Sequence, residues 1–223
     1  MIERAKEAVA KLTCGEHDGT AFLVSGDIAI TATHCILEYI DGDAEIVLTF
    51  FNIVGKEKFP VEAILVSESN SPLAVLKLAE TVETQYLQLG CYLDQMRRNT
   101  EVVSYGYPVV EGVDGYPVDL YINDYLPLNT MNEYDISLLI SEKSKIADYA
   151  GMSGSPVLYR EHVVGILIEE RMEASESGGH AIGLKLISNY KMQKCLENNK
   201  IPFVPLYFKQ IERAVEERKV PKE

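Results

Sequence analysis

The chain has 223 residues, of which 47% are hydrophobic, and its formal net charge is −13 at pH 7. This length is enough for one large or two small domains with a substantial core. The acidic balance argues against nucleic acid as a partner, because phosphates bind Lys and Arg, and no apolar run is long enough to span a membrane.

The N-terminal segment, residues 1 to 13, is expected to form a short amphipathic helix. Its apolar residues recur at helical spacing: Ile2, Ala5, Val9 and Leu12. Charged residues are scattered through the segment, and the apolar stretch of a secretory signal is not seen.

The cysteines and histidines bear on compartment and on metal binding. The four cysteines are widely separated, as in proteins of a reducing compartment: Cys14, Cys35, Cys91 and Cys195. No two of them have the C-x-x-C spacing of a zinc site, and the histidines are isolated. We therefore expect a cytoplasmic protein with no metal and no other cofactor.

From residue 20 onward, short apolar segments alternate with turn signals. A first series covers residues 20–24, 28–32, 45–51, 61–66 and 73–78, and a second covers 100–105, 119–122, 136–140, 155–159, 162–168 and 181–186. This spacing is typical of all-β barrels or sandwiches. We expect one barrel over residues 14–90 and another over 91–187, with the crossover in L-G-C-Y-L-D-Q-M-R-R.

Residues 188–223 are expected to be a helical segment or linker. Residues 188–199 fit a helix with Ser188 as its N-cap, and residues 206–219 fit a second helix with a thin apolar stripe. The second helix is either a solvated terminal helix or a joint to a further domain.

Two short motifs stand at strand ends, one in each half of the chain. The first is I-T-A-T-H-C, residues 30–35, and the second is G-M-S-G-S-P, residues 151–156. Acyl transfer needs a hydroxyl nucleophile, an imidazole that takes its proton and donors that bind the oxyanion. Glycines on both sides of Ser153 let backbone N–H groups converge on one point. The pair of motifs therefore points to His34 and Ser153.

These motifs resemble those of the trypsin-like, chymotrypsin-fold serine peptidases. The segment L-G-C-Y-L-D-Q-M-R-R-N-T-E-V-V-S-Y-G-Y-P resembles the bacterial DegP/HtrA proteases, and G-M-S-G-S-P-V-L followed by V-V-G-I-L-I resembles both these and the glutamyl endopeptidases. The resemblance implies two antiparallel six-stranded barrels, with the site in the cleft between them. It also implies that His34 is the general base, that Ser153 is the nucleophile and that Gly151 and Ser153 form the oxyanion hole. Nothing that resembles a PDZ domain follows.

The third member of the catalytic triad departs from the family pattern. The family carries Asp at the start of the strand that reads P-L-A-V-L-K-L here, so Pro72 stands in its place. A proline cannot orient an imidazole, and loss of the Asp can cost about four orders of magnitude in turnover. The candidate substitutes are Glu68, Asn70 and Ser71 on the same loop, and Asp41 and Asp43 lie just beyond His34. Three alternatives stay open: a substitute orienter, a working Ser–His dyad and an impaired site.

Two further departures concern activation and cysteine pairing. Trypsin has an Asp before its nucleophile, whereas this chain has Met152, so we expect no trypsin-style zymogen cleavage. Secreted relatives bridge the Cys after the catalytic His to an upstream Cys. Here Cys35 is present but Asp18 and Gly19 occupy the upstream region, so that bridge cannot form.

The resemblance also implies where a substrate would lie. A peptide would add as a strand along the segment after V-V-G, namely Leu167, Ile168, Glu169 and Glu170. Leu167 stands where the glutamyl endopeptidases have His, which argues against a preference for Glu. Asp148 and Glu170 would favour Arg or Lys before the scissile bond; alternatively, both carboxylates face water.

The leading hypothesis is therefore an intracellular trypsin-like serine endopeptidase that cuts protein or peptide substrates. Cytoplasmic domains of this type without PDZ domains resemble the protease effectors of bacterial antiviral defence systems, in which a sensor domain or regulatory partner controls the protease. The alternative is a pseudoprotease that binds a peptide or partner without cutting, which Pro72 favours. A third possibility is a latent domain that a partner activates.

Overall fold

The structure is a computed structural model that describes residues 2–66, 72–92, 96–111, 114–125, 134–144, 146–174 and 180–206. The candidate orienters Glu68, Asn70 and Ser71 lie outside the described residues, as does the helix expected beyond Leu206. Within the described residues no helix is long and apolar enough to cross a membrane.

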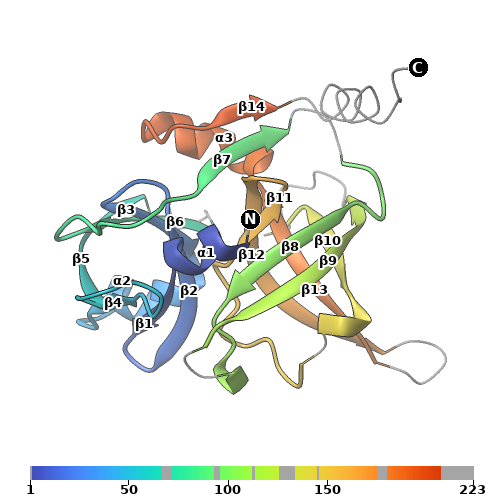
Figure 1. Ribbon diagram of the computed structural model, residues 1–223, viewed down its shortest axis with the longest axis horizontal. Coiled ribbons are helices and arrows are strands. Elements are labelled where there is room, and N and C mark those ends of the chain that lie inside the picture. Colours follow the sequence, from blue (N-terminus) through green and yellow to red (C-terminus); the bar gives the residue numbers. More distant parts are fainter. Residues whose placement is uncertain are drawn as a thin grey trace, which may run out of the picture.

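The first half of the chain forms a closed antiparallel barrel of six strands, on the left in Figure 1. The strands follow the order β1-β2-β3-β6-β5-β4 around the barrel. The elements are α1 (Ile2–Ala8), β1 (Val9–Cys14), β2 (His17–Leu23), β3 (Ile28–Ala32), η1 (Thr33–Ile36), α2 (Leu37–Ile40), β4 (Ile46–Thr49), β5 (Lys58–Val66) and β6 (Leu73–Leu78).

The second half forms an eight-stranded sheet in the order β11-β8-β9-β10-β13-β12-β7-β14. An additional pairing of β11 with β12 closes six of these strands on themselves, and β7 and β14 extend the sheet by parallel pairing. The elements are β7 (Gln88–Tyr92), β8 (Glu101–Gly106), η2 (Val109–Glu111), β9 (Tyr116–Tyr125), β10 (Ile136–Ile140), η3 (Glu142–Ser144), β11 (Pro156–Tyr159), β12 (His162–Ala174), β13 (His180–Ser188), α3 (Asn189–Asn198) and β14 (Val204–Leu206). This all-β architecture confirms the expected fold class.

The N-terminal helix is shorter than the spacing of apolar residues predicted. Helix α1 ends at Ala8, and the next six residues form β1. Strand β1 pairs with β2 on one side and with β4 on the other, so it completes the barrel. Because Val9 and Leu12 are fully buried there, tertiary pairing overrides the local helical pattern.

The helix after the second barrel is present as α3, which begins directly after Ser188. Ser188 ends β13, and its backbone N–H donates to Oδ1 of Asp135 at 2.7 Å. Its hydroxyl donates to the other oxygen of the same carboxylate. Asp135 is itself buried, so these bonds stabilise a carboxylate removed from water. Ser188 therefore binds the buried acid at the point where α3 begins.

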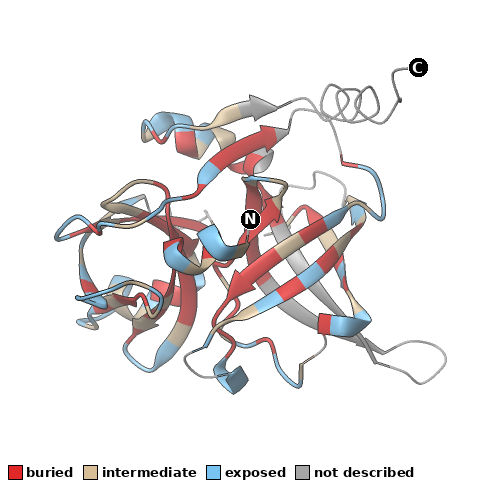
Figure 2. Cartoon of the chain, viewed as in Figure 1, coloured by how far each residue is buried: buried red, intermediate tan, exposed pale blue. Residues whose placement is uncertain are grey.

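Both barrels have apolar interiors, as the buried residues in Figure 2 show. Alternation sets the inward faces: in β9, Val118, Leu120 and Ile122 are buried while their neighbours are more exposed. The core cluster of the first barrel also includes Tyr107 and Ile166 from the second half. Apolar packing therefore continues across the junction and holds the two halves together.

Candidate functional site

His34 lies on the 3₁₀ turn η1, which follows β3 directly. The side chain of His34 is exposed, whereas its neighbour Cys35 is buried. The turn is anchored to β6, because the N–H of Thr33 donates to the carbonyl of Pro72 at 2.9 Å. The fold therefore presents the imidazole at the surface of a rigid barrel end.

Ser153 lies on a tight turn, residues 149–155, which we call the Ser153 turn. Gly151 and Gly154 have φ of +94° and +87°, in the left-handed region that favours glycine. A Cβ on Gly151 would also lie 2.5 Å from the carbonyl oxygen of Tyr107. The path of the backbone therefore requires glycine at positions 151 and 154.

Hydrogen bonds orient the peptide groups of the Ser153 turn. The carbonyl of Ala150 accepts the N–H of Val109 at 2.8 Å, and the carbonyl of Met152 accepts the N–H of Ser155 at 3.0 Å. In a trans peptide the N–H points opposite to the carbonyl. The N–H groups of Gly151 and Ser153 therefore point away from these partners, and within the described residues neither donates to a backbone carbonyl. Such a pair of donors can bind an anionic oxygen.

The structure brings the two predicted motifs together. The thiol of Cys35, the residue after His34, donates to the carbonyl oxygen of Ser153 at 3.6 Å. The N–H of Thr20 on β2 donates to the same carbonyl at 2.8 Å. The turn that carries His34 and the turn that carries Ser153 thus meet across the junction of the barrels, although they are more than 100 residues apart in the chain.

Cys35 acts here as a thiol and not as half of a disulfide. No disulfide joins any of the four cysteines, all of which the structure describes. A Cβ on Gly19 would lie 2.7 Å from Sγ of Cys35, so Gly19 occupies the position of a bridging partner but has no side chain. Burial raises the pKa of the Cys35 thiol to about 12, so the thiol keeps the proton that it donates to Ser153.

Pro72 lies where β6 begins, beside the turn that carries His34. Its carbonyl is the acceptor for Thr33, and its side chain is partly exposed. The residue in the position of the family aspartate therefore binds the histidine turn through its main-chain carbonyl. Asp41, at the end of α2, is exposed, and its N–H donates to the carbonyl of Leu37.

The predicted substrate edge continues directly from the Ser153 turn. The N–H of Gly154 donates to the carbonyl of Leu167 at 2.7 Å, and the N–H of Leu167 donates to the carbonyl of Ser155 at 3.0 Å. Leu167 and Ile168 are buried, and Glu169 and Glu170 continue the same strand, β12. Strand β12 pairs with β13 on its other side, and beyond Ile166 no described strand pairs with this edge. The edge can accept an added strand.

Asp148 is exposed and lies directly before the Ser153 turn. Its Oδ1 accepts the N–H of Ala150 at 2.9 Å, the bond that an Asx turn makes. The next residue, Tyr149, is buried, and its hydroxyl donates to the carbonyl of Ser144 at 2.7 Å. The structure thus gives Asp148 a local role in shaping the turn.

Three residues that contact the Ser153 turn have no marker in the sequence. Thr20 donates its hydroxyl to the carbonyl of Gly151, and Tyr107 and Val109 line the turn from the end of β8 and from η2. The residues Thr20 and Gly151 are separated by 131 positions. Only the closure of both barrels brings them together, so a local motif could not reveal them.

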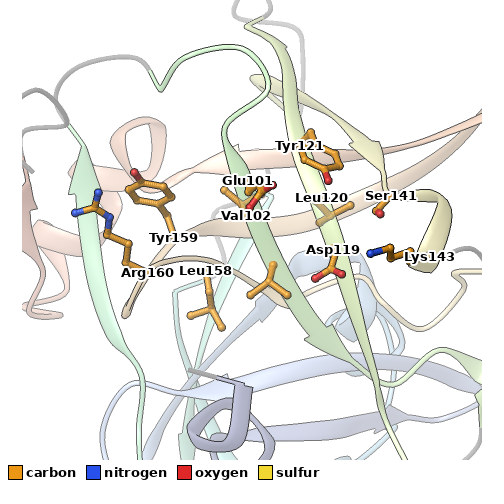
Figure 3. A pocket seen from close by; sticks show the side chains of 11 residues that line it. Glu101, Val102, Asp119, Leu120, Tyr121, Ser141, Lys143, Leu158, Tyr159 and Arg160 are labelled. Carbon is orange, nitrogen blue, oxygen red and sulfur yellow. The ribbon is translucent and has the colours of Figure 1, made fainter. Parts of the chain in front are cut away.

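A hollow of about 490 Å³ on the second barrel contains neither His34 nor Ser153. Figure 3 shows its lining, in which Glu101 and Asp119 lie between Arg160 on one side and Lys143 on the other. The hollow lies at the start of β8, whereas the Ser153 turn packs against Gly106 at the end of that strand. It is therefore separate from the candidate site.

Comparisons with known proteins agree with this arrangement. The sequence model of the trypsin-like peptidase domain matches residues 19–166. The active form of the Rv3671c protease of M. tuberculosis has a similar fold, with a TM-score of 0.63 and 18% identity over 91% of this chain and 85% of that chain. An HtrA-type protease, AlgW with the substitution S227A and a tripeptide, has a TM-score of 0.62 and 21% sequence identity, over 88% of this chain and 61% of that chain. A serine endoprotease of Yersinia pestis has a TM-score of 0.62 and 19% sequence identity, over 89% of this chain and 64% of that chain. No curated protein matches the chain.

Proposed function

Because the chain belongs to the trypsin-like peptidase family, we propose that it is a serine endopeptidase in which Ser153 is the nucleophile and His34 the general base. The observation that carries the proposal is the Ser153 turn. Hydrogen bonds to the carbonyls of Ala150 and Met152 leave two backbone N–H groups, of Gly151 and of Ser153 itself, pointing away from Val109 and Ser155. A turn with this geometry is suited to hold the oxyanion of a tetrahedral intermediate.

The reaction follows from these groups. Oγ of Ser153 attacks the carbonyl carbon of the scissile peptide, and its proton moves to His34. The carbonyl oxygen becomes an oxyanion that accepts hydrogen bonds from the N–H groups of Gly151 and Ser153. The C–N bond then breaks, the amine leaves with the proton from His34, and the acyl group stays on Ser153. A water molecule repeats the sequence and releases the acid.

The open edge of β12 supports a polypeptide as the substrate. An extended chain that pairs with this edge from Ile168 onward would be carried directly to Ser153, because Leu167 is bonded to the Ser153 turn. Main-chain pairing gives affinity without a strong demand on the side chains. We therefore propose protein or peptide substrates that are extended at the cleavage site.

A second candidate function is favoured by one observation. Pro72 binds the histidine turn through its carbonyl, and a proline side chain has no carboxylate with which to orient His34. A pseudoprotease that binds peptides in the same cleft would need no such group. A latent enzyme, whose partner completes the site, would also explain Pro72.

The cellular setting is a further part of the proposal. None of the four cysteines forms a disulfide, which supports a reducing compartment such as the cytoplasm. The role of a protease effector in bacterial antiviral defence, under the control of a sensor domain or partner, rests on the family resemblance alone.

Digestion of an unfolded protein separates the two candidates. We expect the wild type to cleave reduced, carboxymethylated casein and Ser153→Ala to leave it intact, with the new termini identified by mass spectrometry. Ser153→Ala should still bind the cleaved sequences as peptides, because the edge of β12 is unchanged. Equal cleavage by both proteins would overturn the assignment of Ser153. Peptide binding by a wild type that does not cleave would support the pseudoprotease.

A further inference from the structure

We propose that Thr20, on β2 of the first barrel, is a positioning residue that holds the Ser153 turn in its oxyanion-binding conformation. This inference rests on the proposed function. Thr20 does not contact the substrate; it would act on the reaction through Gly151 and Ser153.

Thr20 makes two hydrogen bonds to the Ser153 turn. Its hydroxyl donates to the carbonyl of Gly151 at 2.7 Å, and its backbone N–H donates to the carbonyl of Ser153 at 2.8 Å. One residue of the first barrel therefore binds the carbonyls of Gly151 and Ser153, the residues on either side of Met152. These bonds hold the segment that carries both proposed oxyanion donors.

Two further bonds fix Thr20 itself. Its hydroxyl oxygen accepts the N–H of Tyr107 at 3.1 Å. Tyr107 follows directly after β8, and the end of β8 lies near β2 in Figure 1. Its carbonyl accepts the hydroxyl of Thr31 at 2.7 Å, from the neighbouring strand β3. Thr20 is fully buried. Bonds in a dry environment hold their geometry because water does not compete for the partners.

The Ser153 turn needs an external support of this kind. Glycine at positions 151 and 154 leaves the backbone free to adopt many conformations, so the sequence of the turn does not select one of them. Rotation of the peptide groups around Gly151 would turn an N–H away from the oxyanion. The N–H of Gly151 belongs to the Ala150–Gly151 peptide, whose carbonyl binds Val109. The hydroxyl of Thr20 binds the carbonyl of the next peptide, Gly151–Met152, and so limits rotation about the bonds of Gly151 that join the two peptides.

The geometry also explains why a hydroxyl is needed at this position. A single Oγ1 donates to Gly151 and accepts from Tyr107, so it links the first barrel, the Ser153 turn and β8. Valine has the same shape but can do neither. Serine can do both. The pair of substitutions therefore separates the hydrogen bonds from the packing.

The test compares Thr20→Val, Thr20→Ser and wild type for the second-order rate of labelling by a fluorophosphonate, and for kcat and KM on a peptide found in the casein digest. We expect Thr20→Val to lower the labelling rate and kcat by about 10-fold to 100-fold, up to the loss seen when one oxyanion donor is removed. KM should change less than about twofold, because the edge of β12 is untouched, and Thr20→Ser should restore the rate to within about threefold.

A matched control is Thr49→Val, which removes the hydroxyl of another buried threonine of the first barrel, on β4. It should label like the wild type. If Thr20→Val does not fold, Thr20→Ala, which also removes the hydroxyl, carries the same test. Labelling of Thr20→Val at the wild-type rate would overturn the inference and leave the proposed function intact. A wild type that neither labels nor cleaves would overturn both.

Discussion

Replacing Pro72 by aspartate is expected to raise the rate of Ser153 labelling by about 10²-fold or more, since loss of the orienting Asp can cost about 10⁴-fold in turnover. The main chain at Pro72 already contacts the turn that carries His34, through the bond from Thr33 to its carbonyl. That bond uses the backbone oxygen, so the substitution keeps it. A carboxylate at this position would orient the imidazole and stabilise its protonated form.

The matched control for this prediction is Pro72→Asn. Asparagine has the shape of aspartate and removes the proline ring in the same way, but it carries no charge. We expect it to label at close to the wild-type rate, with the fluorophosphonate rate constant measured for all three proteins in parallel. A gain below about threefold for Pro72→Asp would contradict the account and direct the search to Glu68, Asn70 and Ser71.

Replacing Gly154 by alanine is expected to destabilise the protein by about 2 to 6 kcal/mol. Its φ of +87° alone disfavours a side chain by about 1 to 3 kcal/mol. A Cβ there would also lie 2.1 Å from the carbonyl oxygen of Thr20 and 2.5 Å from Oγ1 of Thr31. Relieving this overlap requires β2 and β3 to move, which adds about 1 to 3 kcal/mol. The free energy of unfolding in urea measures the sum.

Gly55 provides the control that separates strain from overlap. Its φ is +100°, yet a Cβ built on it meets nothing within 4 Å. Gly55→Ala should therefore show the backbone strain without the clash and lower the free energy of unfolding by about 1 to 3 kcal/mol. Equal losses for the two variants would contradict the close packing of the Ser153 turn against β2.

Much of the fold could be predicted from the sequence, because each short strand has its own apolar pattern and turn signals. The segments 28–32, 73–78 and 136–140 form β3, β6 and β10 with the expected bounds. The apolar spacing of the N-terminal segment predicts a helix that is too long, because barrel closure pairs its second half, β1, with β2 and β4.

The candidate site could be predicted only where its residues carry a local motif. The glycines around Ser153 mark a turn in the sequence, and the positive φ of Gly151 and Gly154 agrees with that interpretation. Thr20 carries no such mark, because its partners Gly151 and Tyr107 lie 131 and 87 positions away. Likewise, the sequence shows the substitution at Pro72, but only the fold shows that its carbonyl binds the histidine turn.

The central claim is that His34 activates Ser153 for attack on a carbonyl. Labelling with a fluorophosphonate, followed by intact mass, tests it most directly on wild type, Ser153→Ala and His34→Ala. The account predicts a single adduct on the wild type, mapped to Ser153, no adduct on Ser153→Ala and a labelling rate for His34→Ala that is lower by about 10³-fold or more. Labelling that persists unchanged in His34→Ala, or a wild type that takes up no reagent, would contradict it.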